Sequence, residues 1–276
     1  MTGGTAGIGR AIALALADEG MDVVVVGRDA VRAAAVAAEI GERGVRGRGV
    51  ACDVADREAV VALVDEVWAE SGGIDLLVLN AGVTTAGPLA DHSAEDWSWV
   101  FGVVLMGVVH GVQAALPKML ERGSGHILIT GSHVGLVPDY FLRHGPYAAA
   151  KAGVIGLAAA LRPEVAEQGV DVSVLIPAGV DTSLSESSSR RPAVLAGDLD
   201  AATAPHPMRD IHVREGAPEP IGGVTGWLDP AEVAEITIHG LRQNAAFIIT
   251  HPELCPAVED YYGRLLEAFA ASPRAV

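Results

Sequence analysis

Two side chains that can exchange protons lie four residues apart in the segment Tyr147-Ala148-Ala149-Ala150-Lys151. Residues at this spacing share one face of a helix, so the phenol and the ammonium would face the same cleft. A free phenol titrates near pH ~10, whereas a nearby cation stabilises the phenolate and lowers the phenol's pKa. The pair therefore indicates acid–base chemistry, and an exposed Tyr–Lys surface pair is the alternative.

A glycine-rich turn, Thr2-Gly3-Gly4-Thr5-Ala6-Gly7-Ile8-Gly9, precedes a predicted helix over Arg10–Glu19. Glycines at this spacing let the backbone approach a pyrophosphate, and the N-terminus of the helix offers unpaired N–H groups to phosphate. The turn alone is a weak signal. A pattern of alternating strands and helices follows it, which is the context of a dinucleotide site.

Three further segments follow predicted strands directly. Ser132 comes after one strand, Asn80-Ala81-Gly82 after the strand before it, and Pro177-Ala178-Gly179-Val180-Asp181-Thr182 after the next. Ligands of open α/β sheets bind at the carboxyl ends of parallel strands, so these segments are expected at one site. A plain turn is the alternative for each.

Strands and helices alternate along the whole chain. Short apolar runs predict strands at 23–26, up to 51–52, and at 74–79, 126–130, 170–176 and 247–250. Longer patterns predict helices at 29–44, 53–71, 93–122, 146–168, 229–243 and 256–270. This order predicts a single α/β domain over 1–276 with a Rossmann-like, doubly wound parallel sheet. The stretch 183–223 has no sustained period and is expected to be a substrate lid or a surface loop.

The composition excludes several classes of protein. Half of the residues are hydrophobic, and 19 basic against 35 acidic side chains give a net charge of −16. The chain is therefore expected to be globular, without nucleic-acid or membrane partners. We expect no transmembrane helix and no signal segment, hence a cytoplasmic protein. Cys52 and Cys255 make neither a disulfide framework nor a metal set.

Taken together, these motifs resemble the classical short-chain dehydrogenase/reductase family over nearly the whole chain. TGGTAGIG is similar to the family's TGxxxGxG, LNAG to its NNAG, PAGVDT to its PGxxxT, and Ser132, Tyr147 and Lys151 to its catalytic set. The resemblance implies a seven-stranded Rossmann sheet and a nicotinamide cofactor. It also implies hydride transfer between a secondary alcohol and a ketone.

The resemblance assigns roles to residues of this sequence. Tyr147 would be the general acid/base, Lys151 would lower its pKa and bind the nicotinamide ribose, and Ser132 would bind the substrate oxygen. Cofactor-binding roles fall on Thr2, Gly3, Thr5, Gly7, Ile8, Gly9, Arg28, Asp53, Val54, Asn80, Ala81, Gly82, Tyr147, Lys151, Pro177, Gly179, Val180 and Thr182. Asp53 would contact adenine, Val180 and Thr182 the carboxamide, and Asn80 the ribose or the central strand. No metal is expected.

Arg28 follows the predicted strand 23–26, where the family's NAD-dependent members carry an acidic residue. A guanidinium matches the geometry of a phosphate, so we expect NADP, with NAD as the alternative because Asp29 is adjacent. Ser185 to Ala193 and Asn244 to Thr250 are also similar to a subgroup that oxidises lignin-type aryl ethers at Cα. That weaker similarity implies a bulky or aromatic secondary alcohol.

Two features depart from the family. Val104 stands where the family's long helix carries an asparagine that holds a proton-relaying water, so a catalytically weak nucleotide-binding protein with a structural or regulatory role is the alternative function. Thr2 begins the glycine turn, so the strand that should precede the turn is missing. We expect either a start further upstream or another segment in that strand's place.

The helix Val100–Leu120 is apolar nearly all round and carries Gly102, Gly107 and Gly111. Such a helix is buried, one side against the sheet and the other against a partner subunit. We therefore expect a homo-oligomer, a tetramer or a dimer. The segment Val137–Gly145 is expected in the wall of the substrate pocket.

Overall fold

The computed structural model describes residues 1–184, 212–213, 215 and 226–273. The strands are β1 (Val23–Gly27), β2 (Gly47–Ala51), β3 (Leu76–Leu79), β4 (Gly125–Thr130), β5 (Phe141–Leu142), β6 (Val170–Ile176), β7 (His212–Val213) and β8 (Phe247–Ile249). The helices are α1 (Gly7–Asp18), α2 (Ala30–Gly41), α3 (Arg57–Ser71), α4 (Ala94–Phe101), α5 (Gly107–Arg122), α6 (His133–Leu136), α7 (Gly145–Val165), α8 (Pro230–Arg242) and α9 (Cys255–Ala270). Most of the predicted lid, and all of Ser185 to Ala193, lie outside the described residues.

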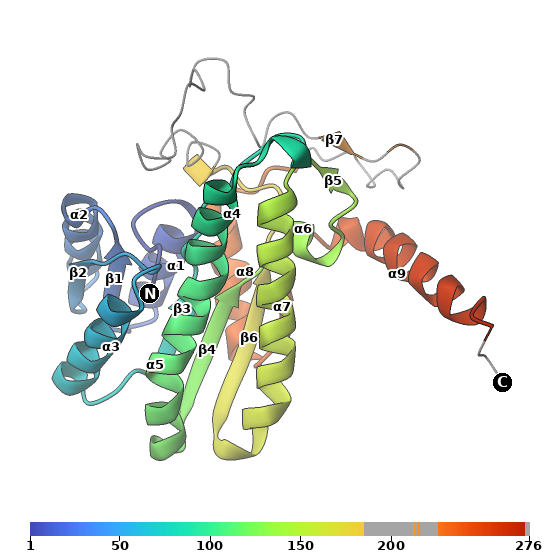
Figure 1. The fold of residues 1–276 in the computed structure, drawn as a ribbon. Helices are drawn as coiled ribbons and strands as arrows, with labels where there is room; N and C mark the ends of the chain where they lie inside the picture. The colour runs from blue at the N-terminus through green and yellow to red at the C-terminus, as the bar shows by residue number, and fades with distance from the viewer. Residues whose placement is uncertain (185–211, 214, 216–225, 274–276) are drawn as a thin grey trace.

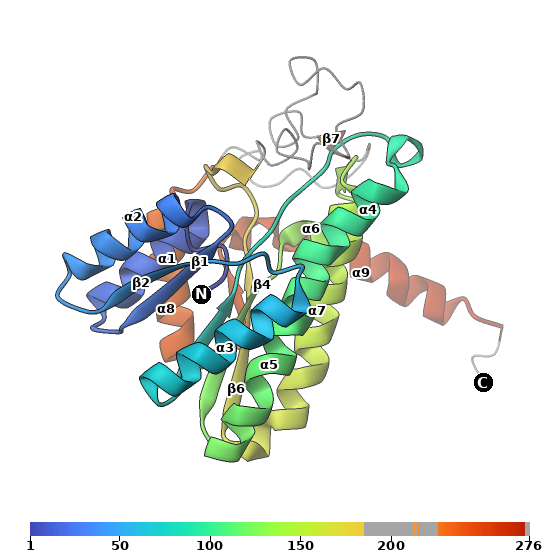
Figure 2. The same cartoon turned by 60° about the vertical axis from the view of Figure 1, so that its left-hand side comes forward.

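The large strands are all parallel, in the orders β1-β2 and β3-β4-β6-β8, while the short β5 and β7 pair antiparallel. Helices α3, α5 and α7 cover one face of the sheet and α1, α2 and α8 the other, as the two views show (Figures 1 and 2). Strands covered on both faces need apolar residues at successive positions, which explains the Val23–Val26 run. The prediction of a doubly wound α/β sheet is confirmed.

The sheet has a seam between β1 and β3. Within the described residues these two strands are joined through Thr2, which bridges Val26 on one side and Leu79 on the other. The Thr2 N–H donates to the Val78 carbonyl at 2.9 Å, and the Met1 carbonyl accepts from the Val26 N–H at 2.9 Å. Met1 and Thr2 thus stand at the carboxyl end of the expected strand. The rest of the seam is a cavity of about 790 Å³ between apolar residues of β1 and β3.

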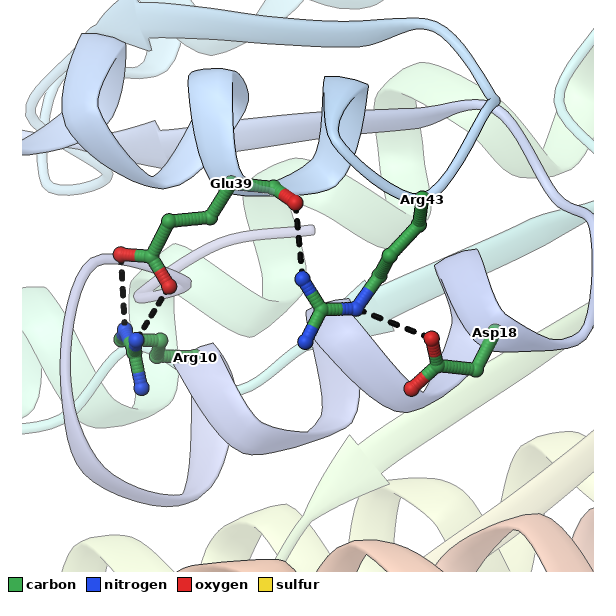
Figure 3. Close-up of polar contacts among 4 residues, drawn as sticks. All are labelled: Arg10, Asp18, Glu39 and Arg43. Atoms are coloured by element: carbon green, nitrogen blue, oxygen red, sulfur yellow. Dashed lines mark hydrogen bonds and ion pairs between the residues drawn. The ribbon is translucent and has the colours of Figure 1, made fainter.

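Ion pairs tie α2 to α1 across the outer face of the sheet (Figure 3). Arg10 pairs with Glu39, and Arg43 Nε lies 2.9 Å from Asp18 Oδ1 while its Nη1 donates to the Glu39 carbonyl at 2.7 Å. These groups are partly exposed, so each pair contributes about 1 kcal/mol or less. They hold the β1–α2–β2 unit against α1. This unit lies on the side of the seam opposite β3, β4, β6 and β8.

The predicted helix 93–122 is continuous but contains a π-helical turn, Gly102–Met106, between α4 and α5. Ala94–Arg122 is long and apolar enough to cross a membrane, which the sequence analysis did not foresee, but 61% of its most apolar window is buried, as in a core helix. A Cβ at Gly107 would lie 2.8 Å from Val54 and one at Gly111 2.4 Å from Leu79. These glycines therefore allow the helix to pack closely against Val54 and Leu79 of its own chain rather than against a partner helix.

One further difference from the predicted elements has a local cause. The helix expected from residue 53 begins at Arg57, because the Asp56 carboxylate caps it by accepting from two backbone N–H groups.

The segment expected in the pocket wall packs elsewhere in part. Tyr140 and Phe141 are buried in a small core with Leu254, the residue before α9, and neither lines the cleft described below. Their expected role in the pocket wall therefore stays a prediction.

Candidate active site

One cleft runs along the carboxyl edge of the sheet and crosses the seam. It is formed by the glycine turn, the segments after β1, β2, β3, β4 and β6, and the first turns of α7. Of the predicted residues it collects Gly3, Thr5, Gly7, Ile8, Gly9, Arg28, Asp53, Val54, Asn80, Ala81, Gly82, Ser132, Tyr147, Lys151, Pro177, Val180 and Thr182. Residues far apart in the sequence thus meet where an open α/β sheet binds ligands.

The glycine turn leaves room beside the N-terminus of α1. Gly3 and Gly7 have φ of +64° and +51°, in the left-handed region, and a Cβ at Gly9 would lie 2.1 Å from the Gly3 carbonyl oxygen. Ala6, the N-cap of α1, makes no side-chain capping bond, so the first N–H groups of the helix are open to an anion. The cradle fits the diphosphate of a dinucleotide.

The proton-exchanging residues lie on one face of α7, as predicted. Tyr147 and Lys151 are 7% and 3% exposed, and the Lys151 Nζ lies 5.7 Å from the centroid of the Tyr147 ring. The Ser132 hydroxyl is near enough to the phenol to lower the pKa of Tyr147. The Lys151 ammonium donates to the Thr130 carbonyl at 2.5 Å. An exposed surface pair is therefore excluded.

Burial dominates the electrostatics of this pair. It raises the pKa of Tyr147 to about 12, against the hydrogen bond from Ser132, which lowers it. Burial also lowers the pKa of Lys151 to about 7. The expected lowering of the phenol's pKa by Lys151 does not appear; the loss of water around Tyr147 raises that pKa instead. The phenol is accordingly protonated at neutral pH.

Two predicted residues lie outside the lining of the cleft. The Thr2 hydroxyl oxygen accepts from the backbone N–H groups of Asn80 and Ala81, so Thr2 braces the seam. Gly179 lies against Trp227, and its carbonyl accepts from the Leu228 N–H. Both residues hold neighbouring segments in place.

Several lining residues were missed by the sequence analysis: Ala6, Val26, Gly27, Cys52, Val83, Val103, Thr130, Gly131, Ala178, Ser183 and Leu184. All of them except Val103 lie within or beside a motif or at the end of a strand. The position at a strand end was the signal available for Thr130 and Gly131. Val103 gave no such signal, because it lies within the long predicted helix, on the π-helical turn.

Arg28 and Asp29 follow β1 but have different surroundings. Arg28 lines the cleft, is exposed, and makes no hydrogen bond or ion pair with the described residues. The Asp29 carboxylate accepts from the N–H groups of Val31 and Arg32 and so caps α2. Asp29 is thereby held away from the cleft.

Residues 1–193 match the family model described as short chain dehydrogenase. The chain belongs to this family. Among curated relatives, the Cα-dehydrogenase of Sphingobium sp. strain SYK-6 is 31% identical over 274 residues, which cover 98% of this chain and 85% of the relative.

Solved structures agree with this assignment. A short-chain dehydrogenase/reductase from Burkholderia phymatum in complex with NAD matches with a TM-score of 0.85 and 30% identity, covering 100% of this chain and 95% of that one. A metagenomic short-chain oxidoreductase in complex with NADP matches with a TM-score of 0.61 and 33% identity, covering 65% and 80%. As a short-chain dehydrogenase, the protein is an oxidoreductase that uses a nicotinamide cofactor on CH–OH groups.

Proposed function

We propose that this protein is an NADP(H)-dependent oxidoreductase that interconverts a secondary alcohol and a ketone. Ser132, Tyr147 and Lys151 would be its catalytic residues. The observation that carries the proposal is that a buried Tyr–Lys pair and Ser132 line the same cleft as a glycine turn with room for a diphosphate.

The bound cofactor supplies or accepts the hydride, and the chain's own residues handle the proton. The Ser132 hydroxyl and the Tyr147 phenol would both hydrogen-bond the substrate oxygen. In the reductive direction the phenol, protonated at neutral pH, gives its proton to that oxygen; in the oxidative direction it takes a proton back. The Lys151 ammonium favours the phenolate left behind, because the charges are opposite.

Replacing Tyr147 tests this assignment. Tyr147→Phe keeps the buried ring but removes the proton donor, so turnover should fall by about 10²–10⁴-fold while NADPH still binds. Turnover is followed by cofactor absorbance with aryl ketones, and binding by calorimetric titration. Unchanged turnover in Tyr147→Phe would contradict the mechanism. A wild-type protein that binds cofactor but turns over no substrate would favour the alternative of a structural or regulatory nucleotide-binding protein.

The choice of NADP is supported by the end of β1. The Arg28 guanidinium lies at the cleft without a partner among the described residues, free to pair with a phosphate. NAD stays the alternative, since the similar Burkholderia structure holds it.

Arg28→Ala tests the cofactor. One charge-assisted contact to phosphate contributes about 1.5–3 kcal/mol, so NADPH should bind tenfold or more weakly while NADH binding stays unchanged. Arg32→Ala is the matched control, because Arg32 is also exposed but pairs with Asp29. An equal loss for both cofactors would show that Arg28 does not read the 2′-phosphate.

We further propose a bulky or aromatic secondary alcohol as substrate, a homo-oligomeric assembly and a cytoplasmic location. The substrate class is supported by the similarity to a protein named Cα-dehydrogenase, which extends over 98% of this chain. The net charge of −16 argues against nucleic-acid and anionic-membrane partners. A panel of aryl and small aliphatic ketones tests the substrate class; preference for the small ones would contradict it.

A further inference from the structure

Thr130, the last residue of β4, contacts both halves of the cleft through different atoms. Its carbonyl accepts from the Lys151 ammonium at 2.5 Å. Its hydroxyl donates to the Asn80 Oδ1 at 3.1 Å. The residue is 5% exposed and lines the cleft, but no motif contains it.

The contact with Asn80 fixes the orientation of an amide that supports the glycine turn. Asn80 Nδ2 donates to the Gly3 carbonyl at 3.1 Å, and a carbonyl can only accept. Oδ1 must then face Thr130, whose hydroxyl must donate. The amide is also packed tightly, since a Cβ at Gly9 would lie 2.5 Å from Asn80 Nδ2.

We propose that Thr130 is a positioning residue that connects the catalytic ammonium to the cofactor-binding turn, its carbonyl holding Lys151 and its hydroxyl holding the turn through Asn80. The proposal rests on the proposed function, because it takes the cleft to be the cofactor site. The two contacts can be separated by mutation: a side-chain replacement removes the hydroxyl and leaves the carbonyl.

Thr130→Val is the central variant, since valine keeps the shape and lacks only the hydroxyl. NADPH and NADH should both bind about three- to tenfold more weakly, the range for one lost neutral hydrogen bond. The kcat at saturating cofactor and its pH profile should stay unchanged, because Lys151 keeps its carbonyl partner. Thr130→Ser should restore wild-type binding. In an Asn80→Ala background, Thr130→Val should weaken binding no further.

Ser173→Ala is the matched control for losing a buried hydroxyl. Ser173 lies on the neighbouring strand β6, is fully buried, and donates to the Ala245 carbonyl at 2.6 Å, far along the chain from the turn. This variant should lower stability without changing cofactor affinity. If it weakens cofactor binding as much as Thr130→Val does, the effect is general destabilisation and the proposal is overturned.

Hydrogen–deuterium exchange of the protein alone separates this proposal from the proposed function. Without any cofactor, amides of residues 2–9 should exchange faster in Thr130→Val than in wild type, Thr130→Ser or Ser173→Ala. Unchanged exchange there would overturn the positioning role even if the enzyme is active. Faster exchange in a protein that shows no ketone or alcohol turnover would support the positioning role and count only against the proposed function.

Discussion

Lys151 is almost completely buried on α7, and burial lowers its pKa from 10.5 to about 7. In the unfolded chain the pKa is near 10.5, so between these two values the unfolded state binds a proton that the folded state lacks. The free energy of unfolding contributed by this group therefore rises with pH across that window. The cost of burying the ammonium is largest below pH ~7.

Lys151→Met should consequently stabilise the protein while abolishing turnover. Methionine keeps the unbranched chain without the charge, so the gain should be on the order of a few kcal/mol at pH ~6 and smaller at pH ~9.5. Urea unfolding at both pH values measures it. Lys118→Met, at the partly exposed lysine paired with Asp65, should change stability little at either pH. Destabilisation by Lys151→Met at pH ~6 would mean that the contact with the Thr130 carbonyl outweighs the burial cost.

Most residues of the site could be predicted because glycine, tyrosine and lysine at fixed spacing have narrow chemical uses. Thr130 could not, since its role depends on Lys151 and Asn80, which lie 21 and 50 residues away. The direction of the Tyr147 pKa shift was also missed. The spacing of Tyr147 and Lys151 predicts that a cation lies near the phenol. The burial that shifts the pKa values of both groups depends on the folded structure and cannot be predicted from the spacing.

At the level of elements, the π-helical turn Gly102–Met106 contains the position where the family's asparagine is expected. Val104 is 0% exposed there and belongs to the main hydrophobic core. An asparagine in its place would bury an amide among apolar side chains. Its effect therefore depends on whether that amide finds a hydrogen-bond partner.

Val104→Asn should lower the free energy of unfolding by about 1–3 kcal/mol without raising turnover, the usual cost of an unsatisfied buried polar group. Thermal unfolding and steady-state kinetics measure the two effects. Val31→Asn on α2 is the control, because Val31 is 79% exposed and should tolerate an amide. A rise in turnover at unchanged stability would show that the relay is merely interrupted by valine.

Strands and long helices were predictable because buried β-branched runs and caps such as Asp29 and Asp229 are local signals. The π-helical turn was not, because Gly102–Met106 has the same glycine and valine pattern as the α-helical residues that follow it, Gly107–Val112. The contacts across the seam were not predictable either. The bridge that Thr2 makes from Val26 to Leu79 needs three distant segments to meet.

For the whole molecule, α5 and α7 lie side by side on one face (Figures 1 and 2), and Leu105 packs on Gly153. Exposed uncharged residues on this side include Met106 of the π-helical turn and Ala152, Gly156 and Ala159 of α7. A group of small and apolar residues is suited to the same group on a second copy. The proposed homo-oligomer would use this surface.

Met106→Glu should dissociate the oligomer, because a carboxylate would be buried without a partner at the contact. Light scattering coupled to size exclusion at micromolar concentration measures the mass. Val31→Glu is the control, since Val31 is 79% exposed on α2, in the unit on the far side of the seam. A monomeric wild-type protein, or dissociation by Val31→Glu alone, would count against this interface.

The seam between β1 and β3 divides the cleft into two sides. Arg28 and Asp53 lie on the side that is joined to the rest of the fold by Met1, Thr2 and the α1–α2 contacts. Tyr147 and Lys151 lie on the other side. Among the described residues few backbone bonds join the two sides at the seam, and local opening there would separate these groups of cleft residues. A dinucleotide bound to both sides would hold them together. At a hundredfold excess over its Kd it would add about 2.7 kcal/mol to the free energy of opening at the seam. Cofactor binding and opening of the sheet at the seam would therefore be thermodynamically linked. The protection of the β1 and β2 amides from hydrogen exchange would then report how much cofactor is bound.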